Sequence, residues 1–175
     1  MEEREKALRD MLYGLARLAI TFLVALFSGI ITTTVGIAVI GNIVNSEGRT
    51  FDEKNLSYIA FAIMFILLCR LFFDDGKRHA AYSRHDTVTA SIVSIACMAL
   101  YFVPVLFLKY VEDYSTLKLY DWLYKPLEWI NYIFGDMTMS VMIGSVVLCA
   151  ALIFFYWLGG KCYYRRLHRR VLRDN

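Results

Sequence analysis

The chain has 175 residues, of which 58% are hydrophobic and 15% aromatic, and its formal net charge at pH 7 is +3. Its mean hydropathy of +0.48 is high for a soluble domain, whose residues are only about half apolar. The composition excludes an ordinary water-soluble globular domain and predicts an integral membrane protein.

Four uninterrupted apolar segments account for this composition. They lie at about Leu18 to Val44 (18–44), Ser57 to Phe73 (57–73), Thr87 to Leu108 (87–108) and Met137 to Leu158 (137–158). Each is near the roughly 17–25 residues that cross a hydrocarbon core. We predict an all-α fold, an integral membrane four-helix bundle formed by a single membrane domain over residues 1–175.

The segments between the spans have their own patterns. Residues 1–17 predict an amphipathic helix that continues into the first span, since Leu8, Leu12 and Leu15 form an apolar stripe. Gly76, after two aspartates, predicts the end of the second span. Arg70 lies just before that end, where its long side chain can reach the headgroups.

The third connection is polar yet rich in aromatic residues. Apolar residues recur at helical spacing over about 114–134, opposite Lys118, Asp121, Lys125 and Glu128. This pattern predicts an amphipathic outer interfacial helix, bent at Pro126, between the third and fourth spans. Its tryptophans, Trp122 and Trp129, form either an aromatic belt at headgroup depth or a contact surface for a partner or lipid.

The basic residues predict the orientation. The N-terminal flank, the second connection counted together with Arg70, and the C-terminal segment hold 14 of the 19 Lys and Arg residues. Basic flanks favour the cytoplasmic side, so both termini should be cytoplasmic in a multi-pass protein of the cell inner membrane. The basic tail, 159–175, should attract anionic lipids through Arg165, Arg166, Arg169 and Arg170. We expect no nucleic acid as a partner.

Chemistry-bearing motifs are missing from the sequence. The spans contain no histidine or carboxylate, and His79, His85 and His168 lie in the flanks. For His79 and His85 we expect a solvated loop rather than a metal cluster with Asp74 and Asp75. We therefore expect no catalytic residues, no cofactor, no metal and no ion-coupled transport, because buried ionisable groups usually mark such functions. An enzyme acting on lipid would have only His79, His85 and Asp86 as candidates.

Neutral polar residues do form stripes in the spans. The residues of interest are Ser28, Gly29, Thr32, Thr33 and Asn42 in the first span and Ser91 and Ser94 in the third. Small and hydroxyl-bearing residues favour close helix packing, and they could instead line a path for a small solute. The leading hypothesis is a non-enzymatic subunit or accessory protein of a membrane oligomer or complex. The alternative is a homo-oligomeric pore or facilitative transporter.

Overall fold

The computed structural model describes residues 2–36, 38, 54–82, 86–109, 118–135 and 137–174. The elements in these ranges are all helices: α1 (Glu2–Val35), α3 (Lys54–Ala81), α4 (Thr87–Lys109), α5 (Lys118–Phe134) and α6 (Met137–Asp174). The all-helical prediction is confirmed for this part of the chain.

Within the described residues, three stretches of helix are long and apolar enough to cross a membrane. They are Leu8–Val35, Lys54–Ala81 and Met142–Arg169. These lengths are compatible with a membrane protein, because about 20 residues of helix span a hydrocarbon core.

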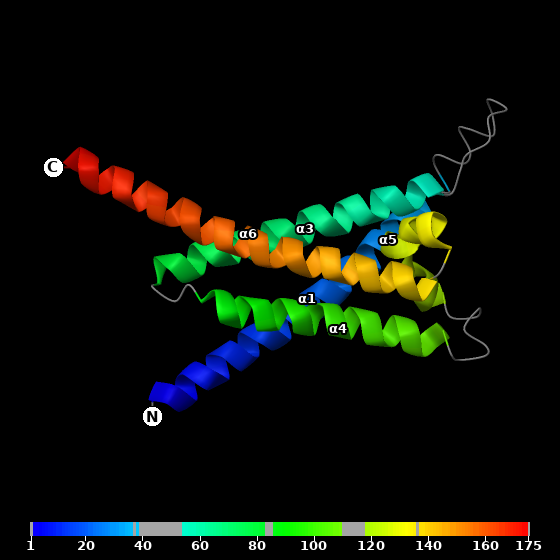
Figure 1. Ribbon diagram of the computed structural model, residues 1–175, viewed down its shortest axis with the longest axis horizontal. Helices are drawn as coiled ribbons and strands as arrows, with labels where there is room; N and C mark the ends of the chain where they lie inside the picture. The colour runs from blue at the N-terminus through cyan, green and yellow to red at the C-terminus, as the bar shows by residue number, and fades with distance from the viewer. Residues whose placement is uncertain are drawn as a thin grey trace.

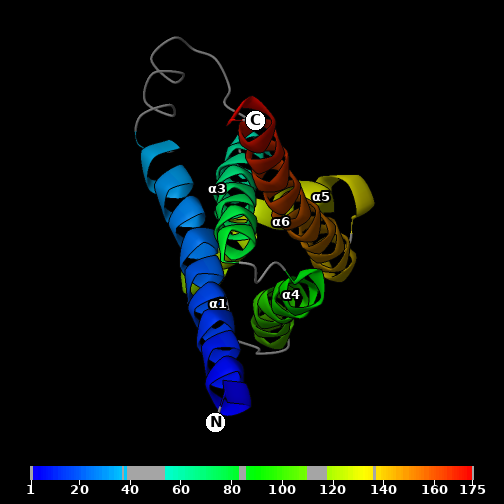
Figure 2. The ribbon, with the colours of Figure 1, turned by 90° about the vertical axis from the view of Figure 1, so that its left-hand side faces the viewer.

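The four longest helices run along the long axis of the molecule, with both chain termini at one end (Figure 1). α1 packs against α3 and α4, and α6 packs against the same two helices. α5 lies across the other end, where it contacts α1, α3 and α6 (Figures 1 and 2). We call the end that carries the termini the terminal end, and the opposite end the α5 end.

The core is built on one stripe of α3. Leu56, Ala60, Met64, Leu68 and Phe72 recur every four residues, and all are buried. This spacing places them on one face of a helix. Buried side chains of α6 at a similar spacing pack in the same core, as do others from α1, α4 and α5. The stripe does not stop at Phe72, because Gly76 and Ala80 continue it.

The predicted helix end at Gly76 is therefore wrong. α3 continues through Gly76 to Ala81, and Gly76 faces α6. A Cβ atom at Gly76 would overlap the carbonyl group of Tyr156, and one at Gly159 would overlap the carbonyl group of Phe73. The two glycines let the backbones touch, and this packing outweighs the roughly 1 kcal/mol that a glycine costs inside a helix.

Candidate functional site

The most unusual feature of the interior is a buried ion pair between α1 and α3 at the terminal end. Arg17 Nε lies 2.6 Å from Asp75 Oδ2, and a second guanidinium nitrogen donates to Oδ1 at 2.6 Å. The two side chains are 13% and 4% exposed. One guanidinium nitrogen thus makes a charge-assisted hydrogen bond, which is stronger than one between neutral groups, and Nε adds a close charge contact.

Aromatic residues and a histidine surround this pair. The hydroxyl of Tyr13 donates to Asp75 Oδ2 at 3.0 Å. The ring of His79 meets the edge of the Tyr13 ring, and its Nδ1 lies 2.8 Å from the hydroxyl oxygen of Tyr156 on α6. The polar cluster of Tyr13, Arg17, Asp75, His79 and Tyr156 thus joins three helices.

Helix geometry explains why these side chains meet. Tyr13 and Arg17 are one turn apart on α1, and Asp75 and His79 are one turn apart on α3, so each pair shares a face. Gly76, beside Asp75, brings α6 and therefore Tyr156 close to α3. The expectations of no buried charge and of a solvated loop at His79 are both wrong, because α3 extends further than predicted.

The arrangement of the cluster favours a structural role. The positive and negative groups neutralise each other, and the carboxylate accepts hydrogen bonds from both Arg17 and Tyr13. Removing one partner of a buried pair leaves an uncompensated charge, which makes such a pair an effective tie between helices. We interpret the cluster as a lock on the relative position of α1, α3 and α6.

A second polar contact ties α5 to α3 at the α5 end. The hydroxyl of Ser57, which is fully buried, donates to the carbonyl of Lys125 at 2.7 Å and accepts from the N–H of Trp129 at 2.7 Å. Those two backbone groups are the ones that an α-helix would join to each other. Ser57 therefore bridges one step of the α5 backbone.

Pro126 has a related effect on the same helix. It has no N–H to give to the carbonyl of Trp122, one turn earlier. That carbonyl occupies the space that a Cβ at Gly29 would fill. Gly29, one of the small residues singled out in the sequence, thus lets α1 approach the backbone of α5.

The hydroxyl groups of the predicted stripes bond to their own helices. Ser28, Thr32 and Thr33 donate to carbonyl groups of α1, and Ser91 and Ser94 donate to carbonyl groups of α4, at 2.6–2.8 Å. Ser28, Thr32 and Ser94 are buried within this one chain. Asn42 lies outside the described residues.

The two tryptophans of the third connection lie on α5. Trp129 packs against the rings of Tyr58 and Phe61 of α3, at centroid distances of 5.6 and 5.3 Å. Trp122 is half-buried. α5 buries Leu127 and Ile130. Lys125 and Glu128 of the predicted polar face pair with each other, and their side chains are only 13% and 27% exposed.

The remaining predicted residues lie at the terminal end. Arg165, Arg166 and Arg169 are exposed on α6, and Arg170 follows them on the same helix. Asp86 caps α4, accepting from the N–H of Val88 at 2.9 Å and the hydroxyl of Thr89 at 2.7 Å. His85 lies outside the described residues, so the three lipid-enzyme candidates are not seen together.

Sequence reasoning missed the Arg17–Asp75 pair, although one signal was present. The apolar spacing of α3 runs through Leu68 and Phe72 to Gly76 and Ala80, which places Asp75 beside a buried face. Treating Asp75 and Gly76 as turn residues concealed this continuation.

Comparisons of the chain with protein-family models, curated proteins and solved structures find no match.

Proposed function

We propose that the chain is a multi-pass membrane protein that works without catalysis, as a subunit or accessory protein of a membrane oligomer or complex. In this proposal α1, α3, α4 and α6 form a four-helix bundle that crosses the inner membrane four times, with both termini in the cytoplasm. α5 then lies at the outer interface, where its orientation across the other helices suits an interfacial helix (Figure 2).

The observation that carries the proposal is an apolar stripe on the first turns of α1. Leu8, Met11, Leu12 and Leu15 are each 52–57% exposed. They precede Arg17, whose pair with Asp75 marks the polar boundary of the packed helices at the terminal end. Figure 1 shows this part of α1 projecting away from the other helices. A stripe of large exposed apolar side chains marks a surface that contacts another protein or the membrane, and we assign this one to a protein partner.

The interior supports an interaction role over a pore. Ser28, Thr32 and Ser94 are buried inside one chain and donate to their own helices. A pore lined by these hydroxyls between copies would need them on an outer surface. A solute pathway is therefore the less favoured interpretation of these serine and threonine stripes.

Association can be tested with two matched variants of the full chain. L8A/L12A/L15A removes most of the apolar stripe, and L23A/F27A/I31A truncates side chains that are 41–61% exposed further along the same helix. We expect differently tagged copies, or a companion subunit at fixed stoichiometry, to copurify in mild detergent with the second variant but not with the first. Equal loss from both variants, or no loss from the first, would contradict the role of the stripe.

A further inference from the structure

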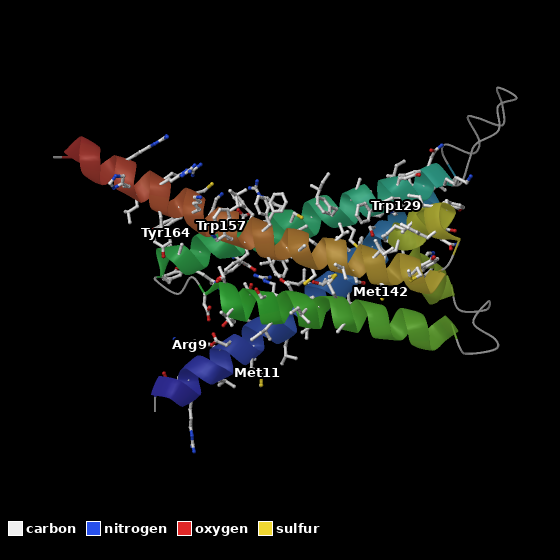
Figure 3. The ribbon with its side chains drawn as sticks, viewed as in Figure 1. Arg9, Met11, Trp129, Met142, Trp157 and Tyr164 are labelled. Atoms are coloured by element: carbon white, nitrogen blue, oxygen red, sulfur yellow. The ribbon has the colours of Figure 1, made fainter. Side chains whose placement is uncertain are left out.

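An open cleft of about 840 Å³ lies at the terminal end, between the start of α4 and the C-terminal part of α6. Its lining includes Thr87 of α4 and, on α6, two aromatic and three cationic side chains: Trp157, Tyr164, Lys161, Arg165 and Arg169. Figure 3 shows Trp157 and Tyr164 along the C-terminal half of α6, at the terminal end.

The cleft is strongly cationic. Lys161, Arg165 and Arg169 are spaced by four residues, so they share one face of α6. No Asp or Glu is among the described side chains that line the cleft. Like charges at this spacing repel one another. An anion between them relieves that repulsion, and arginine is well suited to hold a phosphate through two parallel hydrogen bonds.

The other wall, at the start of α4, adds no net positive charge. Thr87 is the first residue of α4, and the first N–H groups of a helix point out of its N-terminus. The carboxylate of Asp86 accepts a hydrogen bond from the N–H of Val88, and its negative charge offsets the partial positive charge of this helix end. The cations of α6 therefore carry most of the attraction.

Exposed aromatic and apolar side chains lie on the same two helices as the cleft. The Nζ of Lys161 lies 4.4 Å from the centroid of the Trp157 ring, and that ring is 6.1 Å from the ring of Phe154. Phe154 is 52% exposed. On α4, Val88 and Ile92 are more than 60% exposed. A ligand with an anionic head and long acyl chains would cover both the charges and these apolar surfaces.

We propose that this cleft binds the phosphate-bearing headgroup of an anionic phospholipid, with the acyl chains along α4 and α6. The inference rests on the proposed membrane location but not on association with another subunit. The basic residues of the tail then differ in role. Arg165 and Arg169 line the cleft, whereas Arg166 does not belong to the described lining.

The test compares two triple variants that lose the same charge. K161Q/R165Q/R169Q removes the charges of three side chains that line the cleft. R9Q/R78Q/R166Q removes the charges of three exposed side chains elsewhere at the terminal end. Each full-length protein is purified in mild detergent and mixed with phosphatidylglycerol or with phosphatidylcholine of the same acyl chains. Native mass spectrometry counts the lipids that each protein retains.

We expect the unchanged protein and the second variant to retain phosphatidylglycerol about tenfold more than phosphatidylcholine, a preference worth about 1.4 kcal/mol, and the first variant to lose the preference. Equal loss in both variants would indicate general surface attraction and overturn the site. Persistence of the preference in the first variant would do the same.

Two further measurements keep the result interpretable. Inorganic phosphate is added as a competitor, and displacement of the lipid by millimolar phosphate would assign the cleft to a free anion instead. The single variant R165E, checked for unchanged melting, should lose the preference as well, and its retention would contradict the proposal. A protein that is monomeric yet selects phosphatidylglycerol would refute the subunit role and leave this site standing.

Discussion

Buried polar groups join neighbouring helices at both ends of the molecule, but the groups are charged at one end and neutral at the other. At the terminal end, α1 and α3 are joined by the charged groups of Arg17 and Asp75. At the α5 end, α3 and α5 are joined by the neutral hydroxyl of Ser57 and two backbone groups of α5. At both ends a buried polar atom has its partners within the chain, as burial requires.

The difference lies in what happens when a partner is lost. A buried charge has no substitute for its counter-ion, whereas the backbone groups bridged by Ser57 can bond to each other within α5. Glycines assist at both ends: Gly76 and Gly159 bring α3 to α6, and Gly29 brings α1 to α5. We therefore expect the terminal end to be the more sensitive to substitution.

The largest effect is expected at Asp75. D75A leaves the Arg17 guanidinium buried without a counter-ion, which should lower the free energy of unfolding by about 3–5 kcal/mol. The neighbouring D74A breaks surface pairs with Arg70 and Lys77, and since Asp74 itself is 37% exposed it should cost only about 0–1 kcal/mol. Unfolding in mixed micelles of mild detergent and dodecyl sulfate measures both.

A double replacement sharpens this test. R17M/D75L removes both charges, and it should be less destabilised than D75A, since a buried pair can often be replaced by apolar residues. If D74A and D75A lower the free energy of unfolding equally, the Arg17–Asp75 pair does not make the terminal end more sensitive than the α5 end.

A smaller effect is expected at the contact between α3 and α6. G76A places a Cβ against the carbonyl group of Tyr156 and should destabilise by about 1–3 kcal/mol through overpacking. G14A is the control, because its Cβ would lie 3.8 Å from Val93, an ordinary contact. It should be neutral or slightly stabilising, given the better helix propensity of alanine. Thermal melting in detergent compares them, and a neutral G76A would refute the close backbone contact.

The smallest effect is expected at the α5 end. S57A should cost about 1 kcal/mol, the net value of a hydrogen bond, because the α5 backbone groups can pair with each other. Hydrogen exchange at the Trp129 amide should rise, and S91A, whose hydroxyl donates within its own helix, should leave it unchanged. If S57A lowers the free energy of unfolding as much as D75A does, the two ends do not differ in sensitivity.

Much of the helical fold follows from local patterns. Hydrophobic spacing places α1, α3, α4 and α6, and the alternation of polar and apolar residues indicates α5 with Pro126 inside it. The partner of Asp75 could not be predicted in the same way. Asp74 has Arg70 within one turn of its own helix, whereas Arg17 lies 58 residues away from Asp75 and meets it only after α1 packs on α3.

The contacts of Ser57 and the lining of the cleft also depend on tertiary packing. In the sequence, Ser57 is simply the polar first residue of the predicted span 57–73. Its two backbone partners can be identified only once α5 is packed against α3. The cleft at the start of α4 likewise requires Thr87 and the basic residues of α6 to be placed together. Spacing identifies faces of helices, and tertiary packing decides what each face meets.

The central claim, that this chain works in association, is tested most directly by the mass of the purified protein. Native mass spectrometry in mild detergent should give a multiple of the 20.3 kDa chain, or a complex with a second protein at fixed stoichiometry. A stable particle of one chain, with its folding and lipid intact, would contradict the account.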